Sequence, residues 1–240
     1  MQSRVRARAL VAVILSATVL AGCSGAPEPS PQPSIPPGIT APPPTTPASP
    51  TPSVASSLPA EIAGVDTSGW QQIAVPSGTA TFRIPPEWSV SEVEGGLDLL
   101  RGDGQRQLLY REGPDTGDGR CLDASGTAVA WRTAVLDRVD VALTGASGVA
   151  FGAAAVQLGE QWVVSVGLRP APEAQSPSCP IVNAFEAAGS VIGFGSEVVV
   201  DGAGEASAWQ VASLADAEAY LADPEYQTIR AILMSLELLA

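Results

Sequence analysis

The chain has 240 residues, of which 25 are acidic and 12 are arginine, with neither lysine nor histidine. Its formal net charge is −13, so it lacks the basic surface that nucleic acids require, and we expect no nucleic-acid partner. Without histidine there is no Ser-His-Asp or Cys-His catalysis, and without lysine no Schiff base. Carboxylate acid/base chemistry and a metal held by oxygen ligands stay open. No cofactor is expected.

The first 22 residues have the order of a secretion signal. Arg4, Arg6 and Arg8 precede an apolar stretch from residue 9 to residue 20. That stretch is shorter than the roughly 20 apolar residues that a membrane-spanning helix needs. We therefore predict that residues 1–22 are a signal peptide and not a permanent anchor.

The sequence Leu20-Ala-Gly-Cys23 ends this leader and is typical of a lipoprotein cleavage site. It predicts that Cys23 becomes the lipidated N-terminus, although an ordinary secretion signal followed by a chance cysteine is an alternative. Two or more acyl chains anchor a protein stably. The predicted location is therefore the outer, extracytoplasmic face of the cytoplasmic membrane, with the membrane as a partner through the lipid on Cys23.

Residues 23–60 contain the predicted lipidated cysteine and a segment rich in Pro, Ser and Thr. Such a segment has little apolar surface to bury, so we predict a disordered stalk. Serine and threonine beside proline would also suit O-glycosylation. After removal of the leader, nine arginines oppose 25 acidic residues, a formal charge of about −16.

Residues 61–240 are predicted to form a single extracytoplasmic domain made mostly of strands. Apolar residues alternate in short runs separated by Gly, Pro and Asp. The predicted strands are Thr79–Ile84, Trp88–Val93, Leu97–Arg101, Gln107–Arg111, Ala128–Arg132, Asp137–Leu143, Val149–Val156, Trp162–Leu168 and Val191–Val200. A turn at residues 102–104 predicts a hairpin, and this explains the adhesion-like tripeptide Arg101-Gly-Asp103 without a receptor.

The C-terminus changes to a helical period. Ser213 suits the N-cap of one helix, and Asp223 followed by Pro224 suits the start of a second. Tyr226 and Ile229 begin an apolar stripe at helical spacing that would pack on a sheet. The predicted fold class is α+β, with a twisted antiparallel sheet packed by one or two C-terminal helices.

Three segments, near the two ends of the predicted domain, resemble a known group of proteins. The run from Gly78 to Trp88 fits the pattern F-x-(I/L)-P-x-x-W, and the segments 217–226 and 232–236 are also similar to that group. The group comprises actinobacterial surface lipoproteins of largely uncharacterised type. The resemblance implies a PsbP/Mog1-like sandwich and carries no catalytic motif.

Cys121 and Cys179 remain once Cys23 is lipidated, and in an oxidising compartment they are predicted to form a disulfide. A redox or metal-binding thiol pair is the alternative, although such pairs are usually closer in sequence. Asp115, Asp118 and Asp123 are weak candidates for a calcium site, because they do not follow the EF-hand order. Turn formation explains the same aspartates.

The sequence contains five tryptophans, which could line a ligand-binding face or pack in the core. We expect a lipid-anchored binding or assembly module of the cell envelope without catalytic activity, whose partner is an unknown envelope protein or small ligand. The alternative is a carboxylate-dependent hydrolase acting on glycan or peptidoglycan, which would need two carboxylates in one cleft. Calcium-dependent adhesion is a third possibility.

Overall fold

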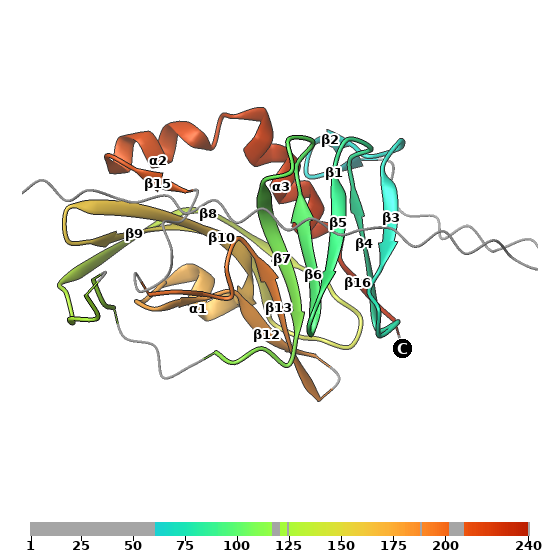
Figure 1. Cartoon of the computed structure of the whole chain (residues 1–240), viewed down its shortest axis with the longest axis horizontal. Coiled ribbons are helices and arrows are strands. Elements are labelled where there is room, and N and C mark those ends of the chain that lie inside the picture. Colours follow the sequence, from blue (N-terminus) through green and yellow to red (C-terminus); the bar gives the residue numbers. More distant parts are fainter. Residues whose placement is uncertain (1–60, 117–120, 124, 188, 202–208, 240) are drawn as a thin grey trace, which may run out of the picture. The chain divides into compact units, whose positions relative to one another are not determined.

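The computed structural model describes residues 61–116, 121–123, 125–187, 189–201 and 209–239 (Figure 1). All of them belong to one compact unit, Ala55–Ala240. None of the helices in these ranges is both long and apolar enough to cross a bilayer. The predicted signal peptide, Cys23 and the stalk lie outside the described residues.

The described residues form short and long strands and three helices. The strands are β1 (Glu61–Ile62), β2 (Val65–Asp66), β3 (Gln71–Ala74), β4 (Ala80–Ile84), β5 (Ser89–Val93), β6 (Gly96–Leu100), β7 (Arg106–Glu112), β8 (Trp131–Val141), β9 (Val149–Leu158), β10 (Gln161–Pro170), β11 (Ile181–Val182), β12 (Ala184–Ala187), β13 (Ser190–Gly195), β14 (Val199–Val200), β15 (Gln210–Val211) and β16 (Glu237–Leu238). The helices are α1 (Ala171–Gln175), α2 (Leu214–Tyr220) and α3 (Pro224–Met234).

The main sheet has nine strands and is antiparallel throughout its described pairs. Its order is β5-β6-β7-β13-β10-β9-β8, with β12 added beside β13 and β15 beside β10. A three-stranded sheet, β16-β4-β3, and two pairs, β1-β2 and β11-β14, complete the strands. The predicted α+β class with antiparallel sheets is therefore confirmed.

One face of the main sheet packs against α3 and the three-stranded sheet (Figure 1). Phe82 of β4 lies 5.1 Å, centroid to centroid, from Phe194 of β13, and Phe194 lies 5.8 Å from Tyr110 of β7. From α3, Tyr226 packs 6.3 Å from Phe151 of β9. These rings close the main hydrophobic core between the layers.

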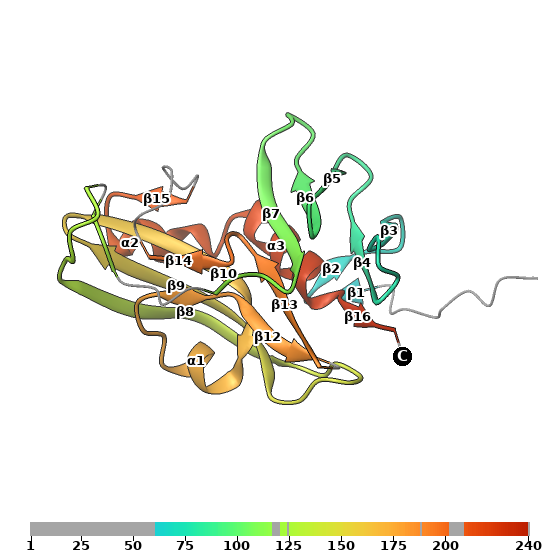
Figure 2. The ribbon, with the colours of Figure 1, turned by 60° about the horizontal axis from the view of Figure 1, so that its bottom comes forward.

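The opposite face of the main sheet is covered by α1 (Figure 2) and by the β11-β14 pair. A second, smaller core lies here, in which Val156 and Val163 of the sheet contact Ile181 and Val200 of the β11-β14 pair. The two faces therefore bury apolar residues on alternate positions of β9 and β10, as two-sided burial requires.

The C-terminal helices begin where the sequence predicts. The N–H of Asp216 donates to Ser213 Oγ at 3.2 Å, and the N–H of Glu225 donates to Asp223 Oδ1 at 2.8 Å. Pro224 occupies the first turn of α3, where its missing N–H costs nothing. The predicted stripe of α3 is buried against the core.

The strands predicted at Ala128–Arg132 and Asp137–Leu143 are one strand, β8, so the predicted break between them is wrong. The register against β9 shifts between Val135 and Asp137, which leaves Leu136 as an extra residue in a bulge. The bulge interrupts the period-two alternation, and this is why the sequence pattern suggested two strands.

The strand predicted at Val191–Val200 is also divided. β13 ends at Gly195, and the chain leaves the main sheet before Val199 and Val200 pair with β11. The apolar sequence continues across the division because both strands are buried. Ile192 and Phe194 of β13 pack in the main core, and Val200 of β14 packs in the smaller core.

Candidate functional site

A cleft of about 990 Å³ opens where the main sheet divides. Along one side of β13, residues 190–193 pair with β12, whereas Gly195 pairs with Gly167 of β10. β12 and β10 therefore share one side of β13 and diverge from each other. The β12-β13 hairpin, the β8-β9 turn and α1 lie around this opening (Figure 2).

About half of the residues that line the cleft are small. One side is formed by all four residues of β12 together with Ser190 and Val191, and the other by the turn at residues 145–149, Pro170 and Glu173. Among the described lining residues the ionisable side chains are Glu173 and Glu186, both exposed, and none is basic. The cleft is therefore a negatively charged surface, and β12, of which Glu186 is the exposed residue, forms one of its walls.

Behind this wall lies a buried arginine. Arg169 at the end of β10 is 1% exposed, and its Nη2 donates to the carbonyl oxygen of Gly152 at 3.0 Å and to Asn183 Oδ1 at 2.5 Å. Within the described chain its Nε and Nη1 have no hydrogen-bond partner. Burial lowers the pKa of Arg169 to about 10, and the charge of Glu173 opposes that shift.

Asn183 connects this arginine to Ser165 of β10 and to the chain between β13 and β14. Its Nδ2 donates to Ser165 Oγ at 2.9 Å and to the carbonyl oxygen of Glu197 at 2.7 Å. A Cβ added at Gly167 would lie 2.4 Å from Asn183 Cγ. The asparagine thus lies in a space that only glycine leaves open, and it fixes the segment just before β12.

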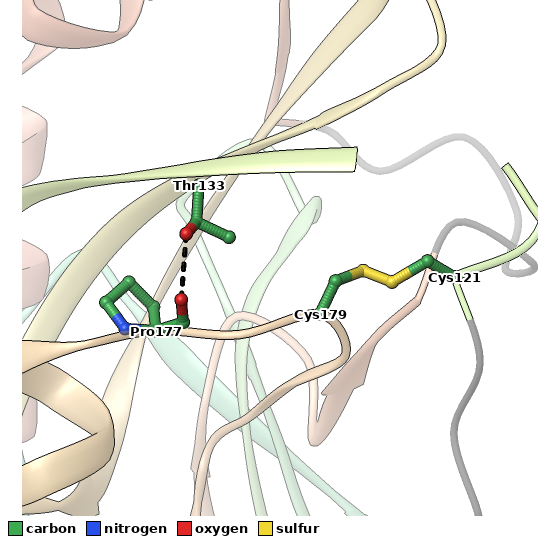
Figure 3. Close-up of a disulfide and its surroundings, with 4 residues drawn as sticks. All are labelled: Cys121, Thr133, Pro177 and Cys179. Carbon is green, nitrogen blue, oxygen red and sulfur yellow. Dashed lines mark hydrogen bonds between the residues drawn. A yellow bond between two sulfur atoms is a disulfide. The ribbon is translucent and has the colours of Figure 1, made fainter. Parts of the chain in front are cut away.

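The predicted cysteine pair lies beside the cleft. Cys121 and Cys179 are at disulfide distance, with their Cα atoms 5.8 Å apart (Figure 3). On the same segment, the carbonyl oxygen of Pro177 accepts a 2.8 Å hydrogen bond from Thr133 Oγ1 of β8. Pro180, the next residue after Cys179, lines the cleft. The disulfide therefore fixes one border of the cleft.

The weak calcium candidates do not gather in the described part of the chain, where no group of three metal-binding side chains is found. Asp118 lies outside the described residues. Asp123 Oδ1 accepts from Ser125 Oγ at 2.6 Å and from the N–H groups of Ser125 and Thr127, and these bonds lower the pKa of Asp123. Asp123 therefore stabilises a turn, which was the alternative to a calcium site for this residue.

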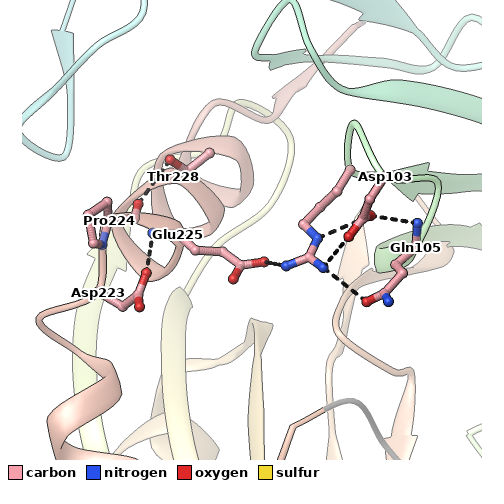
Figure 4. Close-up of polar contacts among 7 residues, drawn as sticks. Asp103, Gln105, Asp223, Pro224, Glu225 and Thr228 are labelled. Carbon is pink, nitrogen blue, oxygen red and sulfur yellow. Dashed lines mark hydrogen bonds and ion pairs between the residues drawn. The ribbon is translucent and has the colours of Figure 1, made fainter.

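A second, smaller cavity of about 170 Å³ lies between the β6-β7 turn and α2. Arg101 at its edge bonds to Glu225 at 2.8 Å, to Asp103 at 2.5 Å and to Gln105 at 3.0 Å (Figure 4). Because these contacts occupy Arg101, its role is to join the β6-β7 turn to α3. The adhesion-like tripeptide is part of this turn, as expected.

The five tryptophans have different environments. Trp88 and Trp209 are buried, while Trp70 and Trp162 are partly buried against the core. Trp131 on the outer strand β8 is 43% exposed. Of these, Trp209 lines the smaller cavity. Core packing accounts for most of them.

Sequence reasoning missed the residues that form the cleft. Glu173 lies on the five-residue helix α1, and Glu186 on the four-residue strand β12, both too short to show a period. Asn183, between β11 and β12, also belongs to no recognisable sequence motif. The available signal was Gly189 followed by Ser190, a turn pair in front of the apolar run of β13.

Compared with known proteins, the chain matches no protein-family model and no curated protein.

Proposed function

We propose that this protein is a lipid-anchored binding module of the cell envelope, and that its ligand occupies the cleft between β12 and the β8-β9 turn. The supporting observation is the cleft itself, whose volume of about 990 Å³ reaches the upper end of the usual range for ligand sites. Its lining, about half of which is small residues, leaves room for a segment of an envelope protein or for a small ligand.

The anchoring part of the proposal rests on the sequence around Cys23. It is tested with metabolic labelling by a radioactive fatty acid. The native chain should carry the label and sediment with membranes, and Cys23→Ser should lose both properties. Label on the Cys23→Ser chain would contradict the proposed anchor.

The binding part is tested by thermal unfolding of the full chain with a panel of envelope fragments. A ligand at about 100 times its Kd should stabilise the fold by about 2.7 kcal/mol. Ser190→Trp fills the cleft from an exposed position, so it should abolish the shift in melting temperature. Ser91→Trp on the distant strand β5 is the matched control and should keep it. If Ser190→Trp left the ligand-induced shift in melting temperature unchanged, the ligand would bind outside the cleft.

A carboxylate-dependent hydrolase remains the second candidate, favoured by the presence of Glu173 and Glu186 in the same cleft. It predicts release of fragments from labelled peptidoglycan or glycan and loss of that release in Glu173→Gln and Glu186→Gln. We favour binding because both carboxylates are exposed, whereas a general acid usually has a raised pKa in a dry site.

The finer fold assignment is also a proposal. An antiparallel sheet with C-terminal helices packed on one face supports a PsbP/Mog1-like sandwich. Comparison of strand order in an experimental structure of this chain with that of the sandwich tests it.

A further inference from the structure

We propose that the cleft binds an extended, positively charged peptide segment, which pairs as an added strand with the outer edge of β12. This inference rests on the proposed function, because it names the class of ligand for the same cleft.

The first argument is the hydrogen-bond register of β12. The N–H of Phe194 donates to the carbonyl oxygen of Asn183 at 3.2 Å, which makes these residues a hydrogen-bonded pair of the antiparallel ladder. Such pairs alternate along a strand with pairs whose backbone groups point outward. Ala184 and Glu186 occupy the outward positions. Their N–H and C=O groups therefore point away from β13, toward the side on which the described residues supply no paired strand.

The second argument is the position of that edge. All four residues of β12 line the cleft, and the opposite wall at residues 145–148 is a turn that cannot complete the ladder. An added strand would lie about 4.8 Å from β12, within the space between the two walls. Strand addition to an open sheet edge is a general mode of peptide recognition, in which the main chain supplies affinity.

The third argument is charge. Glu173 and Glu186 are the ionisable side chains of the described lining, and no basic residue accompanies them. The whole chain has a formal charge of −13. A peptide with arginine or lysine would complement the cleft, and an acidic peptide would be repelled.

The same charges disfavour two other occupants. A second copy that paired through β12 would bring its Glu186 close to the first Glu186, and facing like charges destabilise a strand pair. The chain's own residues 24–60 contain no basic residue and many prolines, which cannot donate to a ladder.

The probe for the test is the acetylated and amidated hexapeptide Arg-Val-Arg-Val-Arg-Val, measured with the full chain by isothermal titration calorimetry. Glu186→Gln removes one charge and keeps the outward N–H, so its Kd should rise about threefold or more. Glu186→Pro removes the same charge and also the outward N–H, so its Kd should rise by roughly a further factor of five to ten. Glu92→Gln, an exposed glutamate on the outer strand β5, is the matched control and should leave Kd unchanged.

Two measurements keep the test decisive if Glu186→Pro fails to fold. The same hexapeptide with N-methyl groups on alternate residues has equal charge but cannot form the ladder, so it should bind at least about tenfold more weakly. Amide exchange of Ala184 and Glu186 should slow when the unmethylated peptide binds.

Equal binding of the two peptides, or unchanged exchange at Ala184 and Glu186, would overturn strand addition. Equal binding of the corresponding Glu-Val hexapeptide would overturn the charge argument. If no peptide binds while envelope fragments still give a thermal shift that Ser190→Trp abolishes, this inference fails and the proposed function stands. Peptide-induced dimerisation, detected by light scattering, would also contradict a one-to-one added strand.

Discussion

Asn183 holds the buried guanidinium of Arg169, because its Oδ1 accepts a 2.5 Å hydrogen bond from Arg169 Nη2. The amide nitrogen of the same side chain donates to Ser165 and to the backbone at Glu197. One side chain therefore joins the end of β10 to the segment that leads into β12. The position of the free edge of β12 depends on this link.

Asn183→Ala should lower the free energy of unfolding by about 3 kcal/mol, because it leaves the buried guanidinium with one hydrogen bond, from Nη2 to the carbonyl oxygen of Gly152. Urea denaturation measures the loss. Gln105→Ala, on an exposed turn, is the control and should change stability far less. A loss below about 1 kcal/mol for Asn183→Ala would mean that another group satisfies Arg169.

Gly167→Ala should destabilise the protein by roughly 3 kcal/mol, since the new Cβ would lie 2.4 Å from Asn183 Cγ. At Gly69 a Cβ meets nothing within 4 Å and φ is not positive, so Gly69→Ala should shift stability by less than about 1 kcal/mol. Melting temperatures of the two variants, measured side by side, test the close packing. Similar values for both would contradict it.

Stability should fall in acid partly through Glu112. Burial acts to raise its pKa, but hydrogen bonds from Ser77, Thr79 and Tyr110 outweigh burial and lower it below the ordinary 4.5. A lowered carboxyl pKa contributes stability that is complete above the unfolded value and is lost as the pH falls through the folded value.

The check is the unfolding free energy of the native chain and of Glu112→Gln between pH 7 and roughly pH 2. The variant should be less stable at neutral pH, and the difference should shrink below about pH 4.5. Glu92→Gln should follow the native curve. A difference that stays constant across this range would rule out the titration of Glu112 as the cause.

Loss of the disulfide should destabilise the fold as a whole. Cys121 and Cys179 are 58 residues apart in sequence, and closing a loop of that length is worth about 4 kcal/mol in the chain-entropy model. Cys179→Ser should lose this amount in urea denaturation, and reduction of the native chain should give a similar loss. Native-like stability after complete reduction would contradict a structural role.

The sequence was a good guide for most elements in which a regular period ran for five residues or more. The capping residues Ser213 and Asp223 and the stripe of α3 were predictable, because a cap followed by helical spacing is a local signal. Most long strands were predictable for the same reason. β8 was not, because the bulge at Leu136 changes the face on which its apolar side chains lie.

The candidate site was not predictable. β12 and α1 are short, and the cleft arises from the divergence of β10 and β12 on one side of β13, which is a long-range relationship. Arg169 belongs to no motif in the sequence, and only the fold shows that it is buried. The pairing of Cys121 with Cys179 was predictable from the number of cysteines and the expected oxidising compartment.

The most direct test of the cleft as the binding site is photo-crosslinking in intact cells. A photoreactive amino acid replaces Ser190 in the cleft or, as the control, Ser91 on β5, each in the full chain. We predict a defined adduct from position 190 that free Arg-Val-Arg-Val-Arg-Val suppresses, and none from position 91. Equal adducts from both positions, or an adduct from 190 that the peptide does not affect in a chain shown to bind it, would contradict the account.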